Sequence, residues 1–380
     1  MSKRVMISAG EASGDLYGAL LSRTIKKAWP DAEIIGIGGN QMKNAGVQLI
    51  APISSAIGIT ETLKHWKLIV QSFKKAKNAL IKQKPDILVL IDYPDFNIAL
   101  AKKAKAAGIP ILYYVSPQVW AWRAGRVKKI ASLVNKIAVL FPFEVDIYKK
   151  TGLPCEFVGH PIAETIVPEL GSETETKKEL KKKLGLDPYK KVITLLPGSR
   201  PIEINRHQTL IKEVAEKIHN EFPDMQIVVP LVSGTNLNED VPDYIKIIKD
   251  HTIEVVACSE ASAVASGTAT LETALLGTPM VVFYKLSTLS FFFGKLLVKV
   301  EFISLVNLLS GKKIVEELIQ RNATAENVFS ELKRILNDSV YRQNMISDLQ
   351  KIKAIMGEKT ASARVASIIG KLAGWNNINA

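Results

Sequence analysis

Short apolar runs alternate with segments of helical spacing through the first half of this chain. The runs expected to form strands occupy residues 5–9, 34–37, 87–91, 111–115 and 136–140. Between them, apolar residues recur every three or four positions, as in 15–28 and 98–107, which predicts helices. The run 87–91 is apolar throughout, as a parallel strand buried on both faces requires. The pattern predicts a doubly wound parallel α/β sheet.

The same alternation restarts after a charged segment, 169–188, which contains Gly171, Gly185 and Pro188. Strands are expected at 191–196, 226–229, 253–256, 263–265 and 280–283, and helices over most of 325–370. The chain of 380 residues exceeds the ~250–300 residues at which one hydrophobic core stops growing. We therefore expect two lobes, 1–168 and 169–345. Helices from about 345–380 should join the first lobe of the same chain or of a partner.

The positive charge lies mainly in the first lobe. The formal net charge is +13, and residues 1–168 hold 23 Lys and Arg against 12 Asp and Glu, whereas the remainder holds 27 against 25. A basic surface attracts nucleic acid, anionic lipid or phosphorylated substrates, so charge alone does not choose among them. Cys155 and Cys258 have no Cys or His at metal-ligand spacing, which argues against a zinc site or a disulfide framework.

Neither an export signal nor a membrane span is predicted. The amino-terminal segment turns polar and glycine-rich after a short apolar run, unlike a signal peptide. The longest apolar stretch, 291–309, is interrupted by Lys295, Lys299 and Glu301, and a span needs ~20 apolar residues. We expect a cytosolic protein whose membrane contact is peripheral.

Polar loops follow two strands of the first lobe, where ligands of doubly wound sheets bind. The loop AGEASGD at 9–15 opens a helix, and its polar residues Glu11, Ser13 and Asp15 are candidates for a binding site; the alternative is an ordinary tight turn. The loop IDYPDFN at 91–97 carries two carboxylates and an amide. A carboxylate there can serve as the general base of a transfer to a hydroxyl group. Alternatively, Asp95 only caps the following helix.

An aromatic and basic segment follows the strand at 111–115. It contains Ser116, Trp120, Trp122 and Arg123, with Arg126 shortly after. Aromatic rings and cations together suit sugar faces and phosphates. The alternative for both tryptophans is packing in the core.

Two loops of the second lobe have features of phosphate-binding loops. Leu-Pro-Gly-Ser-Arg at 196–200 follows a strand, so Gly198 allows close backbone approach and Arg200 offers a bidentate fork. Ser266, Gly267 and Thr268 run from another strand into a helix, with Glu272 one turn further on. A capping box is the alternative for Thr268. A diphosphate leaving group needs such partners.

An amphipathic segment at 59–73 is a candidate membrane contact. Its apolar and basic residues suit an anionic bilayer, and the positions expected to touch the membrane are Leu63, Trp66, Ile69 and Val70, with Lys64 and Lys67. The alternative is a core helix with solvated lysines.

Together, these loops resemble the lipid-A-disaccharide synthase family. The motifs that carry the resemblance are AGEASGD at 9–15, DYPDFN at 92–97, VSP through WAWR at 115–123, LPGSR at 196–200, SGTA at 266–269 and VNLL at 306–309. The resemblance implies a GT-B glycosyltransferase, with two Rossmann-like lobes and a cleft between them. Dehydrogenases and periplasmic-type binding proteins share the strand-helix pattern.

The reaction implied by the resemblance needs neither metal nor cofactor. The sugar of UDP-2,3-diacylglucosamine passes with inversion to the 6-hydroxyl of 2,3-diacylglucosamine 1-phosphate, which gives a β-1,6 disaccharide and UDP. The first lobe, 1–168, would hold the acceptor and face the anionic cytoplasmic side of the inner membrane. The second, 169–345, would hold the donor. A homodimer is possible, and nucleic acid is not an expected partner.

The resemblance also assigns roles to individual residues. Asp95 is implied as the base, and Asn97 belongs with the cleft residues of the first lobe. The implied donor contacts are Gly198, Ser199, Arg200, Ser266, Gly267, Thr268, Glu272, Asn307 and Gln320. The alternatives are another UDP-sugar enzyme, such as a muramyl-pathway transferase or a non-hydrolysing epimerase, and a basic nucleic-acid- or lipid-binding protein without catalysis. A binding protein without catalysis would leave both loops expected to bind phosphate without a function.

Overall fold

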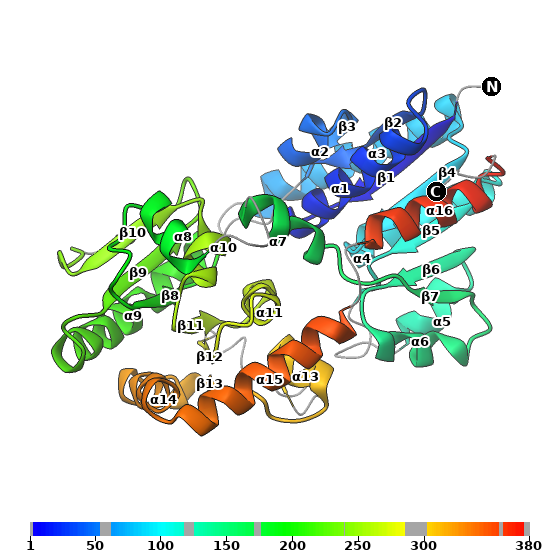
Figure 1. Cartoon of the computed structure of the whole chain (residues 1–380). Helices are drawn as coiled ribbons and strands as arrows, with labels where there is room; N and C mark the ends of the chain where they lie inside the picture. Colours follow the sequence, from blue (N-terminus) through cyan, green and yellow to red (C-terminus); the bar gives the residue numbers. More distant parts are fainter. Residues whose placement is uncertain are drawn as a thin grey trace. The chain divides into compact units, whose positions relative to one another are not determined.

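The computed structural model describes residues 3–53, 62–117, 125–170, 176–238, 240–285, 302–356 and 360–375, without the side chains of 62–66 and 167–170. The chain divides into two units (Figure 1). Unit 1 consists of Met1–Pro161 and Gly357–Ala380, and unit 2 of Ile162–Met356. Each unit is built around its own parallel sheet.

The sheet of unit 1 has seven strands in the order β3-β2-β1-β4-β5-β6-β7, all parallel. Their bounds are β1 Arg4–Ala9, β2 Glu33–Gly38, β3 Gln48–Pro52, β4 Ile87–Ile91, β5 Ile111–Tyr114, β6 Lys136–Val139 and β7 Cys155–Phe157. Every residue of β4 is buried, as its unbroken apolar sequence predicts. The order of the strands reverses between β1 and β4.

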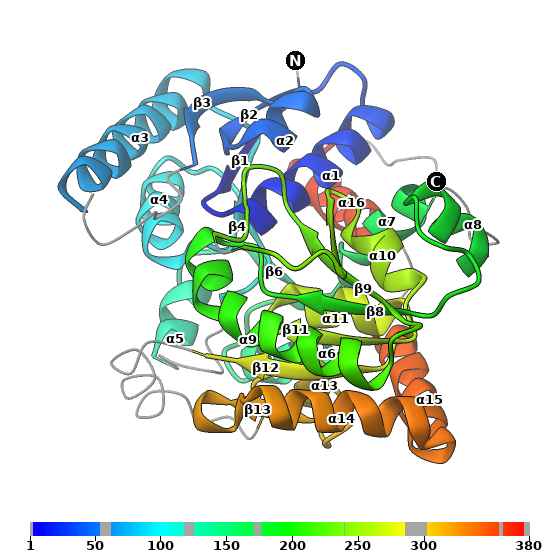
Figure 2. The ribbon, with the colours of Figure 1, turned by 90° about the vertical axis from the view of Figure 1, so that its left-hand side faces the viewer.

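Helices cover this sheet. They are α1 Ala12–Ala28, α2 Asn40–Asn44, α3 Thr62–Gln83, α4 Pro94–Ala106, α5 Arg126–Ala131, α6 Pro142–Lys149 and α16 Ala361–Leu372. Figure 2 shows α3 next to β3 and α4. The buried Ala76 and Leu80 of α3 pack into the same core as Leu88 and Leu90 of β4. No described helix of the chain is long and apolar enough to span a bilayer.

The carboxy-terminal helix α16 packs against α1 of the same chain. The Trp375 ring lies edge-on to Trp29 with centroids 5.0 Å apart, and its Nε1 donates to Asp86 at 3.2 Å. Of the terminal helices expected on the first lobe, α16 therefore lies in unit 1, whereas α15 (Ser339–Ile355) lies in unit 2.

The sheet of unit 2 has six described strands in the order β10-β9-β8-β11-β12-β13, again parallel. Their bounds are β8 Val192–Leu196, β9 Gln226–Leu231, β10 Ile245–Lys249, β11 Ala261–Ala265, β12 Met280–Tyr284 and β13 Glu317–Ile319. The helices are α7 Ala163–Leu170, α8 Lys177–Lys183, α9 Pro201–Glu221, α10 Thr252–Ala257, α11 Thr268–Leu275, α13 Leu305–Ser310, α14 Ala325–Asn337 and α15, with a 3₁₀ turn, η2, at Gln320–Asn322. Here the order reverses between β8 and β11.

One expected strand is wrong. The apolar run 253–256 lies in helix α10, and the strand of that region is β10, which precedes it. A four-residue apolar run carries no periodicity that separates a buried strand from a short helix. Asp250 has a positive φ of 63° and turns the chain after β10, so the run begins a new element.

Gly36 of β2 lies where the backbones of β1 and β2 approach closely. A Cβ at this position would lie 2.2 Å from the carbonyl oxygen of Ile7 on β1. We expect Gly36→Ala to lower the free energy of unfolding by about 3 kcal/mol, because backbone atoms would have to move apart. Gly125→Ala is the control, since its Cβ would meet no atom of the described residues within 4 Å and its φ of −60° suits alanine. Urea unfolding of both variants measures the difference.

Candidate functional site

The first candidate site lies at the carboxyl ends of β1 and β4, where the strand order of unit 1 reverses. Ligands of open α/β sheets bind at such a switch point. The two strands pair in register up to Ala9 and Ile91, so the loops that follow them are neighbours. The Tyr93 ring covers Gly10, where a Cβ would lie 2.2 Å from the ring. This contact explains why the first loop needs a glycine.

The second of these loops has an unusual backbone. Asp92 and Tyr93 both have positive φ, 43° and 48°, a region that non-glycine residues adopt only when their surroundings hold them there. The Asp92 carbonyl oxygen accepts hydrogen bonds from Asn97 Nδ2 (2.7 Å) and from the Tyr113 hydroxyl (2.8 Å). The Asp92 N–H donates to the Val115 carbonyl oxygen at 3.2 Å. Three bonds therefore hold Asp92 in place.

Asn97 fixes this loop from a fully buried position. Its Nδ2 also approaches the carbonyl oxygens of Ile91 (3.2 Å) and Ser8 (3.3 Å), and its Oδ1 accepts from the Ser8 hydroxyl at 2.7 Å. The amide thus joins the ends of β1 and β4. In this structure it positions the loop.

The carboxyl of Asp92 has the electrostatics of a proton acceptor. Burial away from water raises its pKa, the negative charge of Glu11 raises it further, and the backbone N–H of Tyr93 partly offsets both; the result is a pKa of about 6. A base that titrates near neutral pH is deprotonated in the cell and still basic enough to take a proton.

Asp95, the base implied by the sequence, lies in a different environment. It occupies the first turn of α4, its side chain is 82% exposed, and it forms an ion pair with Arg126. The helix begins at Pro94, earlier than expected, so Asp95 lies inside the first turn rather than before it. Its role as the base stays a prediction.

The other residues expected at the site in unit 1 differ in burial and in hydrogen bonding. Glu11 is exposed and Ser13 half-buried at the start of α1. The buried carboxylate of Asp15 accepts the backbone N–H groups of Gly39 (2.6 Å), Gln41 (3.0 Å) and Met42 (3.0 Å), so it holds the start of α2. Buried Ser116 shares a 2.7 Å hydrogen bond with the Tyr148 hydroxyl. Trp120, Trp122 and Arg123 lie outside the described residues.

The second candidate site lies at the switch point of unit 2, after β8 and β11. Residues 197–200 follow β8, and Ser266, Gly267 and Thr268 follow β11, which pairs with β8. The parallel sheet thus brings the two loops expected to bind phosphate to one edge. Gln320 follows β13 at the same edge, with a positive φ of 53°. Glu272 lies one turn inside α11 and is half-buried.

Two backbone amides of the loop after β8 are already occupied within the protein. Glu203 Oε2 accepts from the N–H groups of Ser199 (3.3 Å) and Arg200 (3.4 Å), and Arg200 Nη1 lies 3.5 Å from Glu203 Oε1. Gly198, with φ of +116°, leaves room for this carboxylate, which a Cβ would approach to 2.7 Å. The cation that this loop presents to an anion is the Arg200 side chain, 65% exposed.

His207 ties this loop to the end of β12. Its Nδ1 donates to the Pro197 carbonyl oxygen at 2.7 Å, and its Nε2 accepts the Lys285 N–H at 3.3 Å. Burial lowers the pKa of the imidazole, which agrees with a neutral ring that donates from one nitrogen and accepts at the other. The sequence pattern gave no sign of this contact.

Asn307, expected on the donor side, has a fully buried amide whose contacts are internal. Its Oδ1 accepts the N–H groups of Ile314 (2.7 Å) and Val315 (3.0 Å), and its Nδ2 donates to the Val315 carbonyl oxygen and to Glu317. All four hydrogen-bonding positions of an asparagine amide are used. The side chain holds the segment that leads into β13, and a donor contact for it stays a prediction.

Helix α3, the candidate membrane contact, is only partly described. Lys67 is exposed and Val70 half-buried, whereas Ile69 packs against the core of unit 1 together with Phe73. The side chains of Leu63, Lys64 and Trp66 lie outside the described residues. Leu68, next to the expected stripe, is 51% exposed.

Comparison with known proteins identifies the family. The family model of lipid-A-disaccharide synthetase matches residues 5–369. A lipid-A-disaccharide synthase of Geobacter metallireducens is 41% identical over 98% of each chain. One of Coxiella burnetii is 39% identical over 98% of this chain and 99% of its own. The chain belongs to the lipid-A-disaccharide synthase family. Membership makes it a glycosyltransferase of lipid A synthesis.

Solved structures show the same fold in more distant proteins. UDP-GlcNAc 2-epimerase from Neisseria meningitidis, bound to UDP-GlcNAc, has a TM-score of 0.67 at 13% identity, over 97% of this chain and 100% of that one. The glycotransferase of kitacinnamycin has a TM-score of 0.65 at 12% identity, over 98% and 99%. Identities this low show the fold alone, which is GT-B. Among the described residues, no group of His, Cys, Asp and Glu is arranged to hold a metal ion.

The amide of Asn97 should be required for the fold of the first site. Asn97→Asp replaces a donor to three carbonyl oxygens by an acceptor, so we expect the free energy of unfolding to fall by about 2–4 kcal/mol. Asn78→Asp is the control, since its exposed side chain has no hydrogen-bond partner among the described residues. If the two variants had equal unfolding curves, Asn97 would not be the residue that holds this loop in place.

Proposed function

We propose that this enzyme transfers the sugar of UDP-2,3-diacylglucosamine to the 6-hydroxyl of 2,3-diacylglucosamine 1-phosphate. The family supplies the reaction class, and the chemistry of the two switch points fits it. Unit 1 would bind the acceptor and unit 2 the UDP-sugar. The observation that carries the proposal is the half-buried carboxyl of Asp92, held at the switch point of unit 1 with a pKa of about 6.

The general base of this proposal is Asp92, in place of Asp95. Its carboxylate takes the proton of the acceptor hydroxyl while that oxygen bonds to the anomeric carbon of the donor sugar. The bond from the anomeric carbon to the diphosphate oxygen breaks, and UDP leaves with the bonding electrons. Attack from the face opposite UDP gives inversion. The added proton ends on Asp92 and then passes to solvent.

The leaving group is stabilised from unit 2 in this proposal. The diphosphate carries negative charge that grows as the glycosidic bond breaks, and an arginine fork suits it better than a neutral donor. Arg200 supplies that fork, and the loop of Ser266, Gly267 and Thr268 supplies N–H groups at the start of α11. Glu272 and Gln320 are proposed for the ribose and the rest of the donor.

Membrane association belongs to the same proposal. Both substrates carry acyl chains, so the enzyme must collect them from a bilayer surface, which we take to be the cytoplasmic face of the inner membrane. Helix α3 contains lysines and no Asp or Glu, and its exposed Lys67 and Leu68 support contact with anionic lipid. We also propose that the enzyme assembles as a homodimer.

A labelled-substrate assay tests the reaction. The donor with a radiolabelled sugar and the unlabelled acceptor should give one labelled disaccharide phosphate and an equal amount of UDP. An epimerase would instead return a labelled UDP-sugar of altered configuration, without the acceptor. That second outcome would replace the transferase proposal by the alternative from the same fold.

Asp92→Asn should reduce kcat by about 10² to 10⁴-fold, the usual contribution of a general base. UDP affinity should hardly change, because Asp92 and the proposed diphosphate ligands belong to different units. In the wild type, kcat/KM should fall about tenfold per pH unit below about pH 6, because protonation removes the base, and should level off above it.

Asp95→Asn is the matched control for this prediction. It removes an exposed carboxylate from the same loop region, and its ion pair with Arg126 is worth little at the surface. We expect a much smaller loss of kcat and an unchanged pH profile. If Asp95→Asn abolished turnover while Asp92→Asn kept it, the base would be Asp95.

Arg200→Ala should weaken UDP binding by about 10–100-fold, which corresponds to the loss of a charged hydrogen-bonding group. Calorimetry with UDP measures the effect. Lys217→Ala removes the same charge from the far end of α9, where Lys217 pairs with Glu326 at the surface, and should bind UDP like the wild type. Equal UDP affinity in both variants would exclude Arg200 from the diphosphate site.

A further inference from the structure

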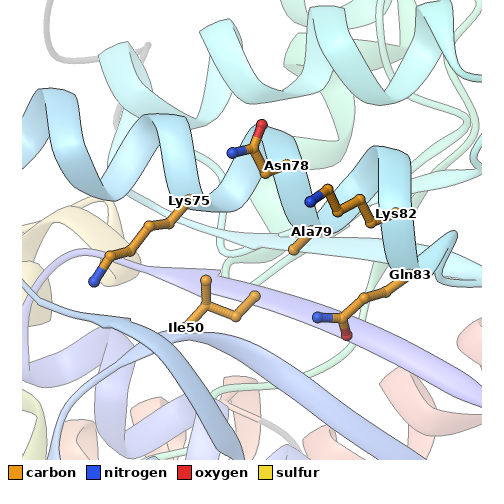
Figure 3. A pocket seen from close by; sticks show the side chains of 6 residues that line it. All are labelled: Ile50, Lys75, Asn78, Ala79, Lys82 and Gln83. Carbon is orange, nitrogen blue, oxygen red and sulfur yellow. The ribbon is translucent and has the colours of Figure 1, made fainter.

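A shallow pocket of about 230 Å³ lies between α3 and the edge strand β3 in unit 1. Its lining consists of Ile50, Lys75, Asn78, Ala79, Lys82 and Gln83. Figure 3 shows Ile50 on the strand below α3, with Lys75 and Gln83 reaching down from the helix on either side of it. The floor of the pocket is apolar and its rim carries two ammonium groups and two amides.

The two lysines of this pocket can act on one ligand. Lys75 and Lys82 are seven residues apart, two helical turns or about 10 Å along the axis, on one face of α3. Each side chain is long and flexible enough to bring its ammonium toward the Asn78 amide between them. The rim thus offers hydrogen-bond donors to one phosphate-sized anion.

Nothing in the described chain neutralises these charges. Neither Lys75 nor Lys82 has an ion-pair or hydrogen-bond partner among the described residues, and no carboxylate lines the pocket. The sequence of α3, Thr62–Gln83, contains no Asp or Glu at all. Two neighbouring cations with no internal counterion are suited to an anion from outside.

The surroundings favour a lipid as the source of that anion. Leu68 lies seven residues before Lys75 on the same face of α3 and leaves 51% of its side chain in solvent. An exposed leucine in line with two lysines suits a bilayer surface, where acyl chains lie beside phosphates. A site for free phosphate would instead be expected to surround the anion with backbone N–H groups.

We propose that the pocket between α3 and β3 binds the phosphate headgroup of an anionic phospholipid. The inference rests on the proposed membrane association and assigns it a specific headgroup site. Lys75 and Lys82 contact the phosphate, Asn78 and Gln83 donate to its oxygens, and Leu68 touches the adjoining acyl region. The lipid held there is neither the donor nor the acceptor of the reaction.

Vesicle sedimentation of the full chain tests this site. The vesicles are phosphatidylcholine alone or phosphatidylcholine with phosphatidylglycerol, and the variant is Lys75→Ala with Lys82→Ala. The control, Lys74→Ala with Lys77→Ala, removes the same charge from exposed positions of α3 outside the pocket. On anionic vesicles we expect the pocket variant to partition about tenfold more weakly than the control, because it also loses charge-assisted hydrogen bonds. Thermal unfolding checks that both variants are folded.

The outcomes separate this inference from the function it rests on. If the wild type binds no vesicle, the proposed membrane association fails and the site with it. If the wild type binds anionic vesicles and both variants lose binding equally, only the general charge of α3 matters and the pocket site is overturned. Release of the wild type, but not of the pocket variant, by millimolar inorganic phosphate would show a free-phosphate site and overturn the lipid assignment.

Discussion

The pairing of β1 with β4 is the contact on which the site in unit 1 depends. Parallel strands end at the same edge of a sheet, and the reversal of strand order at this pair leaves that edge uncovered by a crossover connection. Two loops distant in sequence, one after Ala9 and one after Ile91, therefore become neighbours. Unit 2 repeats the arrangement at β8 and β11. The same constraint thus places carboxylates at one edge of the sheet in unit 1. In unit 2 it places the two loops expected to bind phosphate at the corresponding edge.

Buried polar side chains hold both edges in place. Asn97 joins the ends of β1 and β4, and His207 joins the loop after β8 to the end of β12. Glu203 occupies backbone amides that the sequence pattern assigns to a ligand. Asn97 and His207 are fully buried and satisfy groups that would otherwise lack partners away from water, which is expensive in a low-dielectric interior. Several polar side chains near the two candidate sites thus hold the fold in place.

The sequence predicts the regular part of this fold well. The unbroken apolar run 87–91 predicts a buried parallel strand, and β4 confirms it. The loops after β4, β8 and β11 are predictable because polar residues and glycines follow those apolar runs directly. The strand expected at 253–256 was wrong because its few apolar residues fit a helix equally well. The strand β10 was not predicted, because only two of its residues, Ile245 and Ile248, are buried.

The site itself was less predictable, because the decisive contacts are long-range. Asp92 and Asp95 look equivalent in the motif DYPDFN. They differ because Arg126, distant in sequence, pairs with Asp95, whereas Glu11 and the burial of the loop act on Asp92. The Glu203 contact could have been found, since an acid three residues after Arg200 fits the capping pattern at a helix start. The contacts of Asn307 with 314–317 had no such local sign.

The raised pKa of Asp92 links the role proposed for this residue to the stability of unit 1. A shift from 3.8 to about 6 disfavours the ionised carboxylate by about 3 kcal/mol relative to the unfolded chain. Because the pKa is raised on folding, this penalty is fully present above pH 6 and disappears as the pH falls toward 3.8. The ionised Asp92 carboxylate therefore makes unit 1 less stable at neutral pH than it would be with an unshifted carboxyl. The bonds from Asn97 and Tyr113 to the Asp92 backbone keep the loop from relaxing toward solvent, where the penalty and the basicity would both be lost.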